Sequence, residues 1–371
     1  MDFIEHGFTS NIIAILNKHF PDKAEEALSR SELLHYLNNK TKAANRGSKS
    51  RGSFGNLYAI YVLVEDYVLN AFHKSGSYGE YQGAQFTPLL KRMRELPFGR
   101  KLQNHPLNHR VNQEFAKYFP ASQSSPILRD VETNRYWINE NMLKVETSGG
   151  SVNIAVAVLE IIMAYVDVRM KEHTEFMEYC KKVKRIGKKD PEKLAEFVRG
   201  LLKPDVDARI FEIVSYAILK THYAGQKIYW GWDLDDLTEN QLTLYKTGRT
   251  NANDGGIDFV MRPLGRFFQV TETIDSSKYF LDIDKVQRYP ITFVVKTELR
   301  VDEILKKVKE QAQKKYPVVA IVKRYMQSIE EVINIPRLLA ILNDLLEEGK
   351  GGAVIDEILT HSKLEFDINE I

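Results

Sequence analysis

The spacing of apolar residues changes once along the chain, and this change predicts two kinds of structure. Up to about Val168, apolar residues recur at three- and four-residue intervals, which is typical of amphipathic helices. We expect such helices over residues 11–20, 24–38, 55–72 and 152–168, with loops and short helices over the polar stretch 74–146. From about Asp205 the pattern indicates alternating helices and strands, as in an α/β domain.

A chain of 371 residues is long enough for two compact domains. We expect a mainly helical domain over residues 1–180 and an α/β (α+β) domain over residues 205–371. Between them, six of the nine residues 181–189 are basic, and Asp190-Pro191 follows as a turn and helix start. This composition predicts a basic linker over residues 181–204.

The second half can be divided into elements by its apolar runs and by its glycines and prolines. Residues 257–263 and 266–273 predict a hairpin that turns at Pro263-Leu264-Gly265. The other helices are expected at residues 207–223, 301–315 and 336–348, and the other strands at 227–230, 278–283, 291–297 and 318–323.

Charge and cysteine content exclude several classes of protein. The 52 basic and 50 acidic side chains leave a formal net charge of +2, so any nucleic-acid site must be a local basic patch. Cys180 is the only cysteine, which excludes an internal disulfide and a thiolate zinc cluster. The first residues lack a signal-peptide pattern, and the most apolar window, residues 153–168, is too short to span a bilayer. We therefore expect a cytoplasmic protein with no membrane partner.

The stretch from residue 247 to 273 is the most informative for chemistry. Asp258 follows a glycine pair where a turn enters an apolar strand, so the strand should fix its carboxylate. On the partner strand, side chains alternate, so Gln269 and Thr271 point to one face and Glu272 to the other. Two polar side chains that face the same way are what a metal site requires. A glycine turn with capping acids is the alternative.

In its order of elements the chain resembles the PD-(D/E)xK nuclease superfamily, specifically the restriction-endonuclease-like branch with an Mrr-like (D/N)GGxD…QxK pattern. The family order is a helix bearing a Glu, a strand, an Asp strand and a Gln/Glu-x-Lys strand. This chain has Glu212 on the first helix, then residues 228–230, Asp258 and Gln269-Val270-Thr271. The resemblance covers residues 207–273 and implies a restriction-endonuclease-like core.

The resemblance implies a type II restriction endonuclease, which cuts double-stranded DNA at specific sequences with Mg²⁺. Asp258 would be the principal Mg²⁺ ligand, with the Gln269 amide oxygen beside it and Glu212 completing or supporting the site. Bound Mg²⁺ would lower the pKa of an attacking water and neutralise charge on the scissile phosphate. The implied partners are a second copy of the chain and a cognate DNA methyltransferase. A solvated Glu212 and a structural hydrogen bond of Gln269 are the alternatives.

Thr271 departs from the pattern, since the family usually has a lysine at this position. The missing amine could come from Lys296 or Lys278, and Glu272 could join the metal site if a bulge resets the strand alternation. A second-metal or carboxylate arrangement is another interpretation. In the last interpretation the core is degenerate, and the chain is a DNA-binding or regulatory protein.

Three segments offer side chains for DNA. Residues 40–53 hold basic side chains among glycines and serines, which suits phosphate contacts, with a disordered loop as the alternative. These basic residues are Lys40, Lys42, Arg46, Lys49 and Arg51. Residues close to the glycine pair are also predicted to contact DNA, namely Arg249, Asn251 and Asn253.

The third segment, residues 102–112, is rich in side chains that can read base edges. These are Asn104, His105, Asn108, His109 and Arg110. Its two histidines have ligand spacing, but no third ligand is evident, so DNA contact is preferred over a metal site or a polar surface turn. The helical domain would then serve DNA recognition and dimerisation. Tyr229, Trp230 and Trp232 are predicted to be core and rim aromatics rather than a base-stacking platform.

Overall fold

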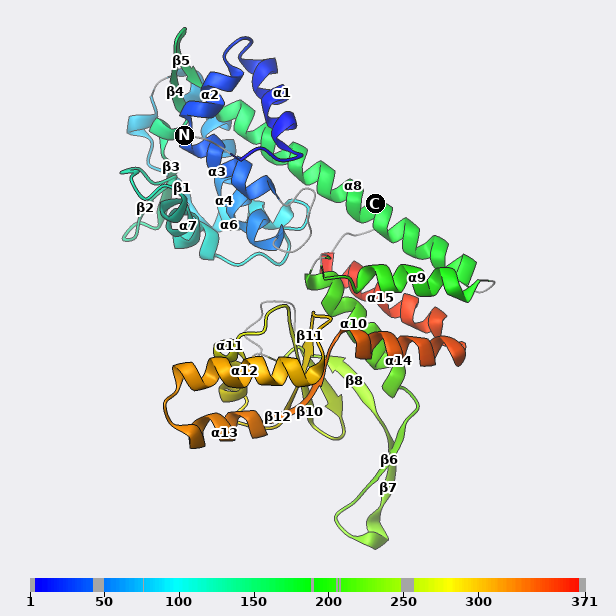
Figure 1. Cartoon of the computed structure of the whole chain (residues 1–371). Helices are drawn as coiled ribbons and strands as arrows, with labels where there is room; N and C mark the ends of the chain where they lie inside the picture. The colour runs from blue at the N-terminus through cyan, green and yellow to red at the C-terminus, as the bar shows by residue number, and fades with distance from the viewer. Residues whose placement is uncertain are drawn as a thin grey trace. The chain divides into compact units, whose positions relative to one another are not determined.

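The computed structural model describes residues 4–42, 50–75, 77–187, 190–204, 206, 208–247 and 257–366. The chain divides into two compact units, residues 1–175 with 366–371 and residues 176–365. It is a mixed α/β protein with several small sheets (Figure 1). Within the described ranges, no helix is long and apolar enough to cross a membrane.

Helices make up most of the first unit, as the apolar spacing predicts. Its core contains the fully buried Tyr58 and Tyr67 of α4 and Tyr165 of α8. The single helix expected at residues 24–38 is two helices, because Ser31 has extended backbone angles and caps α3 by accepting from the N–H of Leu34 at 3.2 Å. The helices are α1 (Thr9–His19), α2 (Ala24–Arg30), α3 (Glu32–Thr41), α4 (Ser50–Leu69), α5 (Phe72–Ser75), α6 (Phe86–Glu95), α7 (Val111–Tyr118) and α8 (Ala155–Gly187), which ends in the second unit.

Short strands occupy parts of the polar stretch for which only loops and short helices are predicted. β1, β3 and β2 form one antiparallel sheet in that order, and β4 pairs with β5. Strands of two to four residues are too short to give a clear two-residue periodicity. Their bounds are β1 (Ala84–Gln85), β2 (Ile127–Asp130), β3 (Arg135–Ile138), β4 (Lys144–Thr147) and β5 (Gly150–Asn153).

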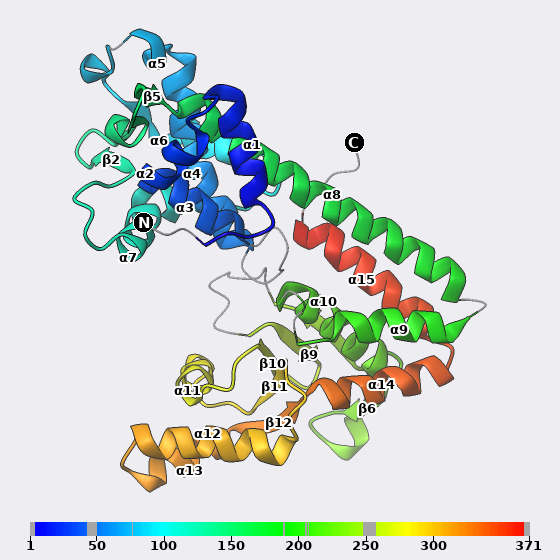
Figure 2. The same ribbon diagram turned by 45° about the horizontal axis from the view of Figure 1, so that its top comes forward.

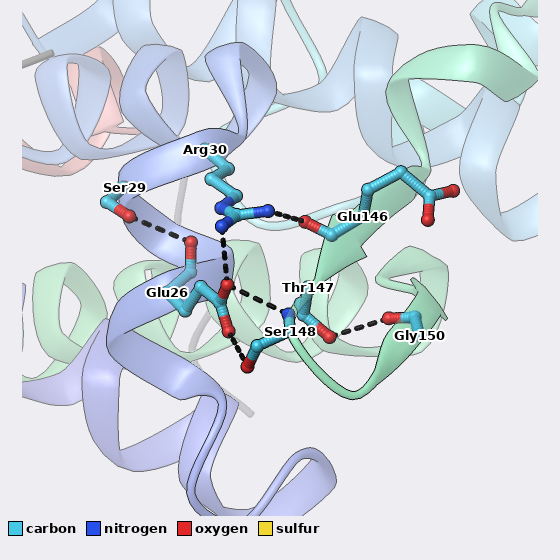
Figure 3. Close-up of polar contacts among 7 residues, drawn as sticks. All are labelled: Glu26, Ser29, Arg30, Glu146, Thr147, Ser148 and Gly150. Atoms are coloured by element: carbon cyan, nitrogen blue, oxygen red, sulfur yellow. Dashed lines mark hydrogen bonds and ion pairs between the residues drawn. The ribbon is translucent and has the colours of Figure 1, made fainter.

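Polar contacts hold the β4–β5 turn against α2 (Figure 3). The Glu26 carboxylate accepts from the Ser148 N–H at 2.9 Å and from its hydroxyl at 2.8 Å. Arg30 pairs with Glu26 at 2.8 Å and donates to the Glu146 carbonyl at 3.1 Å. The hydrogen bond from the Ser148 side chain lowers the pKa of Glu26.

The basic segment predicted as a linker is largely helical. Residues up to Gly187 continue α8, and α9 (Pro191–Leu201) follows. Lys181 pairs with Glu178 one turn earlier, at 2.7 Å, which suits a helix. The helix start predicted at Asp190 is confirmed, since its carboxylate accepts from the N–H of Lys193 at 3.3 Å.

A five-stranded mixed sheet forms the centre of the second unit (Figure 1). The strand order is β12-β11-β10-β9-β8, in which β8, β9 and β10 are antiparallel and β10, β11 and β12 are parallel. The strands are β8 (Thr243–Lys246), β9 (Phe259–Arg262), β10 (Arg266–Thr271), β11 (Ile291–Val295) and β12 (Ile329–Ile333). The helices are α10 (Ala208–Tyr223), α11 (Ser276–Lys285), α12 (Val301–Lys315), α13 (Val319–Gln327), α14 (Ile335–Glu347) and α15 (Gly351–Phe366).

Apolar side chains pack on both faces of this sheet. On one face, Phe293 of β11 stacks on Tyr279 of α11 with ring centroids 4.1 Å apart, and Phe267 joins the same cluster. The next residue, Phe268, lies near Tyr223 of α10, with ring centroids 6.3 Å apart. Because neighbouring side chains of a strand point to opposite faces, α11 covers one face and α10 the other.

The predicted hairpin at residues 257–273 is confirmed, but two other predicted strands are helices. Residues 278–283 belong to α11, which Asp275 caps by accepting from the Ser277 N–H at 2.9 Å. Residues 318–323 belong mostly to α13, where Val322 and Tyr325 are buried at helical spacing. Short apolar runs do not distinguish strands from buried helical turns.

The strand predicted at residues 227–230 is confirmed as β6 (Lys227–Trp230), but it lies outside the central sheet. It pairs with β7 (Thr238–Gln241) in a separate two-stranded hairpin. The strand beside β9 is β8 instead, which the sequence patterns do not reveal. Tyr229, Trp230 and Trp232 are exposed on this hairpin, so their assignment to the core is wrong.

Candidate functional site

The β9–β10 hairpin holds Asp258 by both its main chain and its side chain. Its N–H donates to the Phe268 carbonyl at 2.9 Å, and its carbonyl accepts from the Thr247 N–H at 3.1 Å. Its carboxylate Oδ2 accepts from the Val270 N–H at 2.7 Å. The carboxylate is therefore fixed at the end of the hairpin, as the glycine turn before an apolar strand predicts.

Gln269 lies on β10 between Phe268 and Val270, the two residues that hydrogen-bond to Asp258. The regular pairing ends with Phe267 opposite Val260 and Phe268 opposite Phe259, and beyond it the Asp258 N–H donates to the Phe268 carbonyl. Gln269 Nε2 donates weakly to the Val270 carbonyl at 3.4 Å. Its Oε1 is buried and has no hydrogen-bond partner among the described residues. A buried oxygen of this kind costs stability unless a donor or a cation occupies the position beside it.

Thr271 has an amine beside its hydroxyl, although threonine itself carries no charge. Lys278 Nζ, from α11, donates to Thr271 Oγ1 at 3.1 Å. The first turn of α11 sets this position, because the Lys278 N–H donates to the Asp275 carbonyl at 3.1 Å. Of the two lysines that the sequence offers as substitutes, Lys278 is therefore the one whose amine contacts Thr271, while Lys296 meets it only through its main-chain N–H.

Lys296 and Glu272 bind one another instead. They follow the last residues of β11 and β10, where Thr271 pairs with Val295, and the Lys296 amine lies 2.8 Å from Glu272 Oε1. Lys296 also donates to the Val206 carbonyl, and its side chain is only 3% exposed. The β10–β11 register is unbroken over five pairs, so the bulge that would bring Glu272 to the face of Gln269 is not present.

Glu212 is buried on α10 and pairs with Lys246 of β8 at 2.7 Å. Their side chains are 8% and 13% exposed, so each charge compensates the other in a poorly solvated position. The sequence identifies Glu212 as a metal ligand or a supporting residue, with solvation as the alternative. The structure excludes the solvated alternative and adds Lys246, which no sequence pattern identifies.

The oxygen atoms at the hairpin are suitable for Mg²⁺, but the acidic residues are few. Carboxylate, amide and main-chain oxygens are the ligands that this ion takes. Asp258 supplies a carboxylate, and Gln269 supplies the buried Oε1 described above. In the part of the chain that the structure covers, no group of three or more His, Cys, Asp or Glu could hold a metal ion. A metal at this hairpin would depend on one carboxylate with neutral oxygens.

The first unit presents residues 104–110 as a rigid, mostly exposed segment. η3 (Pro106–Arg110) is a π-helix that leads directly into α7, with Pro106 and Leu107 buried. Asn108 is half-buried and accepts from the Tyr136 hydroxyl at 2.7 Å, so its oxygen has a structural role. The other predicted DNA contacts here are exposed, namely Asn104, His105, His109 and Arg110.

Lys40 is not available to phosphates, which corrects one prediction for the basic segment. Its amine pairs with Glu114 of α7 at 2.6 Å, and its side chain is 9% exposed. Burial lowers the pKa of Lys40, and the Glu114 carboxylate opposes this shift.

Glu114 also accepts a hydrogen bond from Asn56 of α4, and a side chain at Gly55 would meet the Pro106 ring at 3.0 Å. The end of α3 and the start of α4 are thus tied to η3 and α7.

Lys42 lies at the end of α3 and is exposed. Arg51 is described by its backbone alone. The other predicted residues lie outside the described ranges, and they are Arg46, Lys49, Arg249, Asn251 and Asn253.

Comparison with protein-family models, with curated proteins and with solved structures finds no match for this chain. The residues of the β9–β10 hairpin and their contacts are therefore the basis for a proposed function.

Proposed function

We propose that this chain is a Mg²⁺-dependent endonuclease that cuts double-stranded DNA at specific sequences, as a type II restriction enzyme does. One observation carries the proposal. At the end of the β9–β10 hairpin, Val270 fixes the Asp258 carboxylate, the adjacent Gln269 has a buried Oε1 with no partner among the described residues, and Thr271 binds the Lys278 amine.

The order of elements supports the same proposal. Helix α10 carries Glu212, and β8, β9 and β10 follow as consecutive antiparallel neighbours. The nuclease family that the sequence resembles has this order of elements. In the structure, β8 takes the place in that order that the sequence patterns assign to residues 228–230. A restriction-endonuclease-like core in the second unit is part of the proposal.

Each side chain at the hairpin would have a distinct task in phosphodiester hydrolysis. Asp258 and Gln269 would hold Mg²⁺, which when bound activates water and offsets phosphate charge. The Lys278 amine would stabilise negative charge that develops on the phosphate in the transition state. This lysine of α11 would supply the positive charge that, in the family pattern, comes from a lysine at the position of Thr271. Glu212 would stabilise the packing of α10 on the sheet through its ion pair with Lys246.

The exposed residues of the first unit would bind the DNA. Lys42 and Arg110 would contact phosphates, while Asn104, His105 and His109 can bond to base edges. A second copy of the chain and a cognate methyltransferase are the further proposed partners, and a cytoplasmic location is proposed with them.

A second candidate function is a DNA-binding or regulatory protein with a degenerate nuclease fold. The small number of acidic residues at the hairpin favours it, since within the described residues no three potential metal-binding side chains cluster. A plasmid-cleavage assay distinguishes the two candidate functions. Discrete fragments of plasmid DNA in Mg²⁺ support a restriction enzyme, a smear supports a nonspecific nuclease, and intact plasmid supports the second candidate.

The change Asp258→Asn should reduce the cleavage rate by orders of magnitude, because it removes the formal charge that holds Mg²⁺. DNA binding should persist, since the substitution removes a negative charge close to a phosphate. Asp302→Asn, at an exposed position in the first turn of α12, is the matched control. Wild-type cleavage by folded Asp258→Asn protein would contradict the assignment.

The change Lys278→Ala should slow cleavage by about 10²-fold while DNA affinity stays nearly constant, because only transition-state stabilisation is lost. Lys285→Ala removes another lysine from α11 and should cleave normally. Lys296→Ala should mainly lower the melting temperature, since it breaks the pair with Glu272. If Lys278→Ala cuts at the wild-type rate, the amine at Thr271 has no catalytic role.

The double change Lys42→Ala and Arg110→Ala should lower the slope of log affinity against log salt by about two, since each residue removed is one phosphate contact. The measurement uses DNA binding in the Asp258→Asn background, where the DNA stays intact. Lys171→Ala, an exposed lysine of α8, should leave the slope unchanged. An unchanged slope in the double variant would exclude both residues from the interface.

A further inference from the structure

The β6–β7 hairpin carries a group of large apolar side chains in solvent. Residues 227–241, called the arm below, comprise β6, the tip helix η5 (Leu234–Asp236) and β7. Figure 1 shows the arm extending away from the rest of the second unit. Trp232 and Leu234 are 87% and 84% exposed, and Tyr229, Trp230 and Leu237 are exposed with them.

Hydrogen bonds and ring contacts fix the tip of the arm. The Trp230 and Trp232 rings meet edge to face with centroids 5.3 Å apart. Asp233 accepts from the Leu234 N–H at 2.6 Å, and Thr238 donates to the Trp230 carbonyl at 3.1 Å. A two-stranded hairpin has little stability of its own, and a contiguous exposed apolar surface marks an interaction site.

The net charge of the arm indicates which kind of partner surface it can bind. Its fifteen residues contain one lysine, Lys227, against four carboxylates, which gives a net charge of −3. Lys227 is also paired with Glu239 at 2.7 Å. A nucleic acid or an anionic lipid surface would be repelled by this charge. The partner surface should therefore be apolar and basic.

A surface with these properties exists elsewhere in the second unit. Val318, Val319 and Ile321 are exposed where α12 leads into α13. Residues 311–329 contain no acidic residue and carry a net charge of +4, from Lys314, Lys315, Lys323 and Arg324, all exposed. We call residues 314–324 the α13 patch. Figures 1 and 2 both show the arm apart from α12 and α13, so the arm does not cover the patch of its own chain.

We propose that the arm of one chain binds the α13 patch of a second copy, and that the second arm binds the first patch in return. A twofold dimer closes with two identical contacts of this kind. Trp232 and Leu234 would bury their side chains against Val318 and Val319. The acidic tip would lie beside Lys323 and Arg324. This inference does not depend on nuclease activity.

Sedimentation equilibrium of the full chain tests the apolar contact. The wild type should form a dimer, and Trp232→Ala with Leu234→Ala should raise the dimer dissociation constant by about thirtyfold, as loss of a central aromatic contact does. Leu264→Ala, an exposed leucine at the β9–β10 turn, should not change it. A monomeric wild type, or a dimer unaffected by the arm variant, would overturn the proposal.

Charge reversal tests the choice of partner surface. An arm variant, Asp235→Lys with Asp236→Lys, should be monomeric, and so should a patch variant, Lys323→Glu with Arg324→Glu. An equimolar mixture of the two should form a heterodimer, because each reversed surface then meets its complement. Dimerisation by either variant alone, or failure of the mixture to dimerise, would contradict the contact. A melting curve for each variant confirms that it is folded.

Discussion

The hydrogen bond from the Val270 N–H to the Asp258 carboxylate is the contact on which the candidate site depends. It joins the end of β9 to β10 beyond the last regular pair of the hairpin. The same contact ties the carboxylate to the residue that follows Gln269, whose Oε1 has no partner in the described part of the chain. The main-chain bonds to Phe268 and Thr247 hold the backbone of Asp258, and this bond adds a link from its carboxylate to β10.

Lysines from three different elements set the electrostatics around this hairpin. Lys246 pairs with Glu212, and both side chains are largely out of solvent; the buried Lys296 pairs with the exposed Glu272. Lys278 contacts the neutral hydroxyl of Thr271 instead of a carboxylate. Its charge is therefore available to an anion such as a phosphate, while the other two charges are offset within the protein.

The sequence predicts the hairpin well because its signals are local. A glycine turn, strand alternation and Pro263-Leu264-Gly265 define Asp258 and Gln269 without knowledge of distant residues. The errors have two sources, a short apolar run that fits both helix and strand and a pairing of distant elements. The apolar run in α11 reads as a strand, yet Asp275 caps it as a helix, which carries Lys278 to Thr271. The pairing of Glu212 with Lys246 depends on strand order, which no local pattern encodes.

Metal binding by the free protein tests the account of the hairpin most directly. Mn²⁺ can replace Mg²⁺ as a probe in electron paramagnetic resonance titrations without DNA. The account predicts that Gln269→Leu weakens Mn²⁺ binding by about tenfold and that Asp258→Asn abolishes it. The melting temperature of Gln269→Leu should change little, because within the described residues its Oε1 has no hydrogen-bond partner and the bond lost from its Nε2 to Val270 is weak. Equal Mn²⁺ affinity for the wild type and both variants would contradict a metal site at this hairpin.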